Sequence, residues 1–449
     1  MVEKVDLLIK NGYVVTMDKE GRLFKNGAVA VSGNRIVAVD KTSSIEQKYS
    51  AERVIDATGK IVMPGIVVSH CHTHGQASMG MPAEVEMENF YDELAKWWWP
   101  FLEDQLKKED VYALAKYAIT EIAKNGVTTV DDVMEAPKDL PGVLDAEGKA
   151  FLEVGMRGIL AFEATERISK ENGKLGIQEN VNFIKKWNDK PDALLRGVMC
   201  VHTVFSCSPE MLKEVKELAD KYNAWINLHV EESMYEVEYS KKHFGKLPFE
   251  HLRDIGFLGP NVLAAQCVNT SDKEIKILKE YDVKVSHNIQ TNMVIGVGLA
   301  PVPKMIDEGI TVSLGNDGFY LDMFETIRTV YITHKGVLKD QSVLPPKKVL
   351  EMATIDGARA VGLENDIGSL EVGKKADIIV VDLNEPVPLN NSNIYGNIVS
   401  FGMGKNVKYT IIDGKIVVEN QKVLTVDEEK VRKEAYDATV RIWTRNGFL

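Results

Sequence analysis

The chain has 449 residues, of which 45% are hydrophobic, and its formal net charge at pH 7 is −12. This length exceeds one usual domain, so we expect a large domain with a smaller companion, while the acidic balance disfavours nucleic acid and anionic membrane surfaces as main partners. No apolar run is long enough to cross a membrane, and the four cysteines lack C-x-x-C spacing, which favours free thiols in a reducing, cytoplasmic compartment.

The first 60 residues are predicted to be β-structure. Apolar runs flank two Gly-containing segments, Asn11-Gly12 and Ser32-Gly33-Asn34, and this arrangement is typical of hairpins. Similar apolar, strand-like runs occur near the C-terminus, in residues 376–381 and 409–418. We therefore expect one small β-sandwich domain built from both termini. Its predicted parts are 1–60 and 366–425, and a helical tail is predicted over 426–449.

Residues 61–365 alternate short apolar runs with helix-compatible segments, which predicts βα units around a parallel sheet. Eight such units fit an α/β fold of the (β/α)8 or TIM-barrel type, whose active site lies at the C-terminal ends of the strands. The predicted strands cover 61–72, 127–133, 155–165, 194–205, 224–232, 261–268, 283–292 and 311–317. Helices are predicted over 109–124, 210–222 and 271–281.

The first predicted barrel strand ends in two histidines, His70 and His72. Their i, i+2 spacing projects both side chains from the same side of a strand, and neutral imidazole is a usual ligand of zinc or iron. His229 and Asp317 each follow another apolar, strand-like run. Three strand ends that each offer a ligand predict a metal site at the mouth of the barrel.

The chain also resembles the amidohydrolase superfamily, in particular its branch of mononuclear-metal aminohydrolases and chlorohydrolases. That branch includes 5-methylthioadenosine/S-adenosylhomocysteine deaminases, guanine deaminases and triazine hydrolases. The resemblance covers nearly the whole chain. It is carried by Pro64-Gly65 before His70-Cys71-His72, by His229-x-x-Glu232, and by the segments 286–292, 315–318, 322–325, 352–358 and 367–377.

The resemblance implies one divalent metal ion per chain, zinc in the first place and iron as the alternative. The ligands that it implies are His70, His72, His229 and Asp317. A metal-activated water would attack an electrophilic ring carbon, with Asp317 taking its proton and Glu232 protonating the ring nitrogen and the leaving amine. The implied reaction is hydrolytic deamination of a small-molecule substrate, a purine, pterin or other nitrogen heterocycle, by a homodimer or larger homo-oligomer.

Two other functions stay open. The same site could hydrolyse a ring amide or a carbon–halogen bond, or the chain could be a weakly active metal-binding scaffold. The departure that bears on this choice is Gln266, because relatives carry a histidine there, in Ala-His-Cys. An amide donates and accepts hydrogen bonds but carries no charge. We expect Gln266 to contact either the attacking water or a polar edge of the substrate.

The identity of the catalytic glutamate depends on the local backbone. Strict strand alternation from His229 points to Glu231, whereas the family pattern points to Glu232, and we predict Glu232. Substrate contacts are further expected from His202, His287, Asn292 and Trp97. For His287 and Asn292 the alternative is that they hold loops. Aromatic residues in 81–106 most often pack in a core, and the alternative for this segment is an aromatic lid over the pocket.

Overall fold

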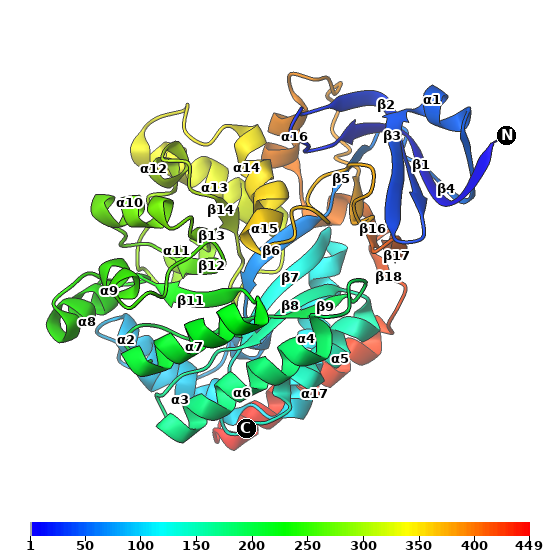
Figure 1. Ribbon diagram of the computed structural model, residues 1–449. Coiled ribbons are helices and arrows are strands. Elements are labelled where there is room, and N and C mark those ends of the chain that lie inside the picture. The colour runs from blue at the N-terminus through cyan, green and yellow to red at the C-terminus, as the bar shows by residue number, and fades with distance from the viewer. Residues whose placement is uncertain (1) are drawn as a thin grey trace.

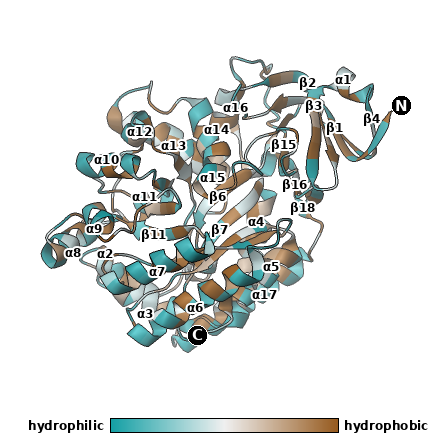
Figure 2. Cartoon of the chain, viewed as in Figure 1, coloured by the Kyte–Doolittle hydropathy of each residue, from teal (hydrophilic) through white to brown (hydrophobic). Residues whose placement is uncertain are grey.

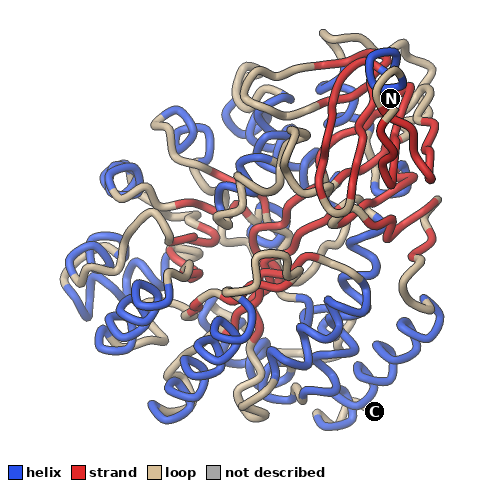
Figure 3. The backbone as a smooth tube through the Cα atoms, turned by 45° about the vertical axis from the view of Figure 1, so that its right-hand side comes forward, coloured by secondary structure: helices blue, strands red, loops and turns tan. Residues whose placement is uncertain are grey.

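Two groups of strands organise the computed structural model, which describes residues 2–449 (Figure 1). Strands from both ends of the chain form one mixed sheet in the upper right of Figure 1. The middle of the chain forms a ring of parallel strands surrounded by helices (Figure 3). The predicted combination of an α/β barrel and a small β unit built from both termini is therefore confirmed.

The barrel strands form two parallel sheets, ordered β6-β7-β8-β9 and β10-β11-β12-β13-β14. Parallel bridges between Ala164 and Val201 and between Cys71 and Asp317 join these sheets, so that β9 and β10 act as one strand of an eight-stranded ring. The strands are β6 (Ile66–Cys71), β7 (Val127–Met134), β8 (Arg157–Phe162), β9 (Leu195–Gly197), β10 (Met199–Cys200), β11 (Ile226–Val230), β12 (Val262–Gln266), β13 (Lys284–His287) and β14 (Val312–Leu314).

Helices cover the outside of the barrel. All residues of β7 are buried, as expected for a parallel strand covered on both faces. In Figure 2, brown stretches alternate with paler ones on β6 and β7, whereas much of the outer helical surface is teal. The longer helices here are α4 (Lys108–Lys124), α5 (Val143–Val154), α6 (Lys170–Trp187), α7 (Pro209–Tyr222), α8 (Met234–Phe244), α10 (Asp272–Glu280), α13 (Met323–Leu338) and α14 (Pro346–Ala353). The shorter ones are α9 (Pro248–Asp254), α11 (Ile289–Val294), α12 (Val302–Asp307) and α15 (Ile355–Ala360).

The predicted strand 61–72 is divided at Gly65. Its first part, β5 (Ile61–Pro64), pairs with strands of the terminal sheet, and only β6 belongs to the barrel. A Cβ atom at position 65 would lie 2.1 Å from Thr128 Oγ1. Glycine therefore allows the close approach at which the chain passes from one sheet to the other.

The terminal sheet has nine strands in the order β18-β17-β16-β15-β5-β1-β2-β3, with β4 paired to β1. The predicted turn at residues 32–34 joins β2 to β3, but Asn11 lies inside β1 at a register shift, with a φ of 64°. The elements are β1 (Glu3–Val15), β2 (Leu23–Ser32), β3 (Arg35–Lys41), α1 (Thr42–Glu46), β4 (Tyr49–Asp56), β15 (Ile378–Val381), α16 (Ile394–Phe401), β16 (Val407–Ile412), β17 (Lys415–Glu419) and β18 (Lys422–Val423).

The C-terminal helix α17 (Glu428–Arg445) lies along α4 at the bottom of Figure 1. Arg441 and Arg445 of this helix form ion pairs with the buried Asp110 of α4. Within residues 2–449, no helix combines the length and the apolar character needed to span a membrane. The four cysteines are all buried and free, in agreement with the prediction.

Candidate active site

The four predicted metal ligands converge at the C-terminal ends of β6, β11 and β14. His229 Nε2 lies 3.1 Å from His70 Nε2 and 3.3 Å from His72 Nε2. The carboxylate oxygens of Asp317 lie 3.8 Å and 4.0 Å from the same nitrogens of His70 and His72. All four residues are buried, and their ligand atoms lie within 4.8 Å of one another. Closure of the barrel between β6 and β14 explains why distant sequence positions meet here.

This donor set fits a divalent metal ion. His72 Nδ1 lies 2.8 Å from the carbonyl oxygen of Val133, and His229 Nδ1 lies 2.8 Å from Glu163 Oε1. A proton on each Nδ1 leaves the Nε2 lone pair free for a metal. A tetrahedral zinc ion with bonds of about 2.0–2.1 Å holds its ligand atoms about 3.3 Å apart, which is close to the two separations between histidine nitrogens.

The backbone is left-handed at three strand ends that border the site. The φ angle is 56° at Glu231, 79° at Gln266 and 56° at Asp317. Non-glycine residues adopt such angles rarely, and these conformations cluster at functional sites. At Glu231 the chain leaves the strand alternation, so that Glu232 lines the cavity, while Glu231 is buried near Glu274. The structure therefore places the predicted Glu232 in the site.

A cavity opens over His72, His229 and Asp317. Burial raises the pKa of Glu232 well above its ordinary value; His229 opposes this shift, whereas Asp317 and Glu93 reinforce it. A carboxyl group that stays protonated can donate its proton to a bound molecule. The cavity is lined by His72, Phe90, Glu93, Leu94, Trp98, Glu103, Glu163, His202, His229, Glu232, Gln266, Thr291, Ile295, Asp317 and Phe319.

Gln266 lines the cavity, but protein groups hold both ends of its amide. Its Nε2 donates a hydrogen bond to Asp317 Oδ2 at 2.7 Å, and Asn292 Nδ2 donates to its Oε1 at 2.6 Å. The backbone N–H of Gly318 donates to the other oxygen of Asp317 at 2.8 Å. Gln266 thus orients Asp317, and its expected contact with water or substrate stays a prediction.

Of the remaining predicted contact residues, only His202 lines the cavity, whereas His287 and Asn292 do not. His202 lines the cavity, with its Nδ1 2.9 Å from Ser206 Oγ. His287 is buried outside the cavity lining, and its Nε2 lies 3.1 Å from His334 Nε2. Asn292 lies behind Gln266 rather than in the cavity wall. One polar atom of each residue thus contacts a protein side chain, whereas His287 Nδ1 and Asn292 Oδ1 have no hydrogen-bond partner within residues 2–449. The substrate contacts expected of both residues stay predictions.

The segment between β6 and α4, which we name the roof segment (residues 79–106), forms one wall of the cavity. Trp98 of this segment lines the cavity, whereas Trp97 lies outside the lining and packs against Trp98 with ring centroids 6.0 Å apart. Trp98 rather than Trp97 therefore faces the cavity, and the substrate contact expected of Trp97 stays a prediction. The roof segment contains α2 (Phe90–Asp92), the π-helix η2 (Glu93–Trp98), α3 (Trp99–Phe101) and the 3-10 helix η3 (Glu103–Gln105), and the 3-10 helix η1 (Thr73–Ser78) precedes it.

Three acidic residues of the cavity, namely Glu93, Glu103 and Glu163, were not predicted from the sequence. Glu163 directly follows the apolar run of β8, so the strand-end signal that located His229 was available for it. Glu93 and Glu103 lie on short helical pieces without a regular pattern. Burial and the charge of Asp317 raise the pKa of Glu93 to about 7.

Comparison with known proteins identifies the family. The sequence profile of the Amidohydrolase family matches residues 61–417, which is well over half of the chain. The chain therefore belongs to the amidohydrolase family, as its resemblance predicted. The matched residues include the barrel, the three histidines and Asp317.

Curated relatives share nearly the full length of the chain. A 5'-deoxyadenosine deaminase of Methanosarcina acetivorans is 38% identical over 444 residues, covering 98% of this chain and 99% of its own. A 5-methylthioadenosine/S-adenosylhomocysteine deaminase of Thermoanaerobacter pseudethanolicus is 35% identical over 431 residues, covering 95% and 97%.

Solved structures show the same architecture. An adenosine deaminase of Xanthomonas campestris with bound zinc superimposes with a TM-score of 0.90 at 25% identity, covering 99% of this chain and 100% of its own. An atrazine chlorohydrolase of Arthrobacter aurescens, in complex with zinc, gives a TM-score of 0.84 at 23% identity, covering 96% and 100%. The second likeness concerns the fold.

Proposed function

We propose that this amidohydrolase deaminates an adenine nucleoside whose 5′ position carries hydrogen or a thioether. In this reaction water replaces the exocyclic amine of the ring, giving a hypoxanthine nucleoside and ammonia. The observation that carries the proposal is the convergence of Glu232 and Asp317 on one cavity above three buried histidines. The substrate class is supported by the two named relatives, which match this chain over nearly its whole length.

The protein side chains have distinct roles in this proposal. When bound, a divalent ion supplies Lewis-acid activation of the attacking water. Asp317 takes a proton from that water, and Gln266 holds the carboxylate in place for this step. Glu232 gives its proton to the ring nitrogen next to the reacting carbon, because burial keeps the carboxyl group protonated. Trp98 presents an aromatic side chain to the flat ring.

We further propose one zinc ion per chain, held by the three histidines and Asp317. Three nitrogen donors and one carboxylate suit zinc, and they also suit iron. Elemental analysis of the purified protein should give about one divalent ion per chain. A protein without bound metal, before and after reconstitution, would contradict this part of the proposal.

The reaction is tested with metal-loaded protein and a panel of compounds. We expect ammonia release, together with the ultraviolet change from adenine to hypoxanthine, with 5′-deoxyadenosine and 5′-methylthioadenosine. Guanine, a pterin and a chlorotriazine serve as comparison substrates, and Asp317→Asn serves as the inactive control. Chloride release from the triazine without nucleoside turnover would instead support the carbon–halogen alternative. If none of the compounds is turned over, the remaining alternative is that the protein is a weakly active metal-binding scaffold.

A further inference from the structure

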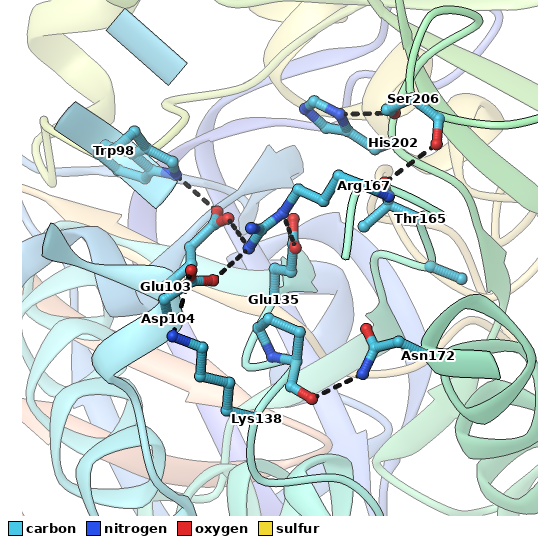
Figure 4. A network of polar contacts seen from close by, with 12 residues as sticks. Trp98, Glu103, Asp104, Glu135, Lys138, Thr165, Arg167, Asn172, His202 and Ser206 are labelled. Atoms are coloured by element: carbon cyan, nitrogen blue, oxygen red, sulfur yellow. Dashed lines mark hydrogen bonds and ion pairs between the residues drawn. The ribbon is translucent and has the colours of Figure 1, made fainter. Parts of the chain in front are cut away.

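A buried ion-pair network lies beside the metal site and joins the roof segment to the barrel (Figure 4). Arg167, in the loop after β8, lies at its centre. Its Nε donates to Glu135 Oε1 at 2.5 Å, and one terminal nitrogen lies 2.9 Å from Asp104 Oδ1 and 3.4 Å from Glu103 Oε2. Two of these carboxylates belong to the roof segment, while Glu135 follows β7. The guanidinium thus connects three separate parts of the chain.

The carboxylates depend on Arg167 for their charge balance. The side chains of Glu135 and Glu103 are 0% and 2% exposed, and that of Arg167 is 9% exposed. Burial raises the pKa of Glu103 to about 7, and the charge of Arg167 acts against this rise. A buried carboxylate without a partner is costly. Loss of Arg167 would therefore favour movement of Glu103 and Asp104, and with them the roof segment, toward water.

Glu103 connects the ion-pair network to the cavity. Its Oε1 accepts a hydrogen bond from Trp98 Nε1 at 2.6 Å, and both residues line the cavity. The guanidinium carbon of Arg167 also lies 4.9 Å from the ring centroid of Trp99. The Trp99 ring packs edge-on against His202, with centroids 5.7 Å apart. Arg167 therefore supports two walls of the cavity but is not itself part of its lining.

We propose that Arg167 is a positioning residue for substrate binding, which fixes Trp98 and Glu103 over the metal site through its ion pairs. Its kinetic test rests on the proposed deaminase function. Because the network has no metal ligand among its members, its loss should change how well the substrate is held and leave the bound metal in place.

The test compares Arg167→Met with Arg167→Lys. We expect Arg167→Met to raise KM for the nucleoside on the order of 10- to 100-fold, because small displacements of positioning groups have effects of this size, with a smaller change in kcat and unchanged metal content. Lysine keeps one charge but lacks the planar fork, so Arg167→Lys should recover part of the loss. Lys138→Met is the control, since Lys138 is 57% exposed and lies 3.4 Å from Asp104 at the edge of the network.

A second readout does not need turnover. Hydrogen exchange of the backbone amides in residues 90–106 should accelerate in Arg167→Met and stay unchanged in Lys138→Met. Unchanged KM and unchanged exchange in a folded Arg167→Met protein would overturn the proposal, as would a fall in kcat accompanied by loss of metal. If Arg167→Met does not fold, the same measurements on Arg167→Lys decide. A wild-type protein that deaminates no adenine nucleoside would defeat the proposed function, while hydrogen exchange would still test Arg167.

Discussion

The two walls of the cavity are built in different ways. The metal-binding wall uses residues at the ends of parallel strands, where each strand is hydrogen-bonded to its neighbours, including the bridge between Cys71 and Asp317. The roof segment is a series of short α, π and 3-10 turns, held to the barrel by side-chain contacts such as those of Arg167 with Glu103 and Asp104. We infer from this difference that strand register sets the positions of the metal ligands, and we expect the packing of the roof segment to set the fit to the substrate.

This division has a physical basis. A strand inside a closed barrel cannot shift its register without breaking ladders on both sides, so the ligands keep their positions. A loop at the C-terminal face can change its packing without breaking the barrel. Changes in the metal-binding wall should therefore affect metal content and kcat, and changes in the roof segment should affect KM.

The largest effect is expected from His229→Ala. Removal of this ligand leaves three, and it also leaves the carboxylate of Glu163 without its 2.8 Å partner. We expect loss of most bound metal and a fall of turnover to background, as measured by elemental analysis and ammonia release. His243→Ala, which changes an exposed histidine, is the matched control. Full metal content in His229→Ala would show that the metal lies elsewhere.

The next largest effect is expected from Glu232→Gln. The amide cannot donate the acidic proton, so kcat should fall by a factor on the order of 10²–10⁴ while the metal stays bound. Glu231→Gln is the matched control, because Glu231 faces away from the cavity. A larger loss in Glu231→Gln than in Glu232→Gln would mean that strand alternation continues through this segment in the working enzyme.

A smaller effect on metal affinity is expected from Glu163→Gln. The carboxylate contacts His229 Nδ1 and so fixes the ring and strengthens it as a donor. Loss of such a contact typically weakens metal binding by about 10- to 100-fold, which competition with a chelator measures. With the metal at saturating concentration, kcat should recover in large part. Unchanged affinity would show that the ligand geometry does not depend on this contact.

The smallest effect is expected from Trp98→Ala, and it should appear in KM. Loss of the aromatic face and of the hydrogen bond to Glu103 should raise KM by about 10-fold, in line with the usual strength of aromatic contacts. Metal content should not change. Trp97→Ala is the control, since that ring lies outside the cavity lining. An equal rise in KM in both variants would contradict the proposal that Trp98, and not Trp97, contacts the substrate.

Local patterns in the sequence were sufficient for the barrel and for the metal ligands. Apolar runs alternate with amphipathic segments because each strand is buried on both faces, and His70 and His72 share one side because side chains alternate along a strand. His229 and Asp317 could be predicted because strand ends meet at one face of a barrel. These features depend on residues that are close together in the sequence.

Tertiary structure decided the details that depend on distant residues. Gly65 divides the predicted first strand because Thr128 lies against it. Asn292 and Asp317 both form hydrogen bonds with the amide of Gln266. These contacts join two strand ends and helix α11, and no local pattern indicates them. Likewise, the choice of Trp98 over Trp97 follows from the π-helical turn and from the hydrogen bond to Glu103.

The proposed proton donor, Glu232, shows the boundary between what the sequence determined and what the tertiary structure decided. Alternation along the strand favours Glu231, and only the family pattern favoured Glu232. The left-handed backbone at Glu231 settles the geometry, and such a conformation in a non-glycine residue persists where the surrounding structure holds it. The backbone N–H of Asn269 donates to the Glu231 carbonyl at 2.9 Å, and the Glu231 N–H donates to Glu236. Periodicity is a local property of the chain, whereas the contact with Asn269 forms only after distant segments have packed together.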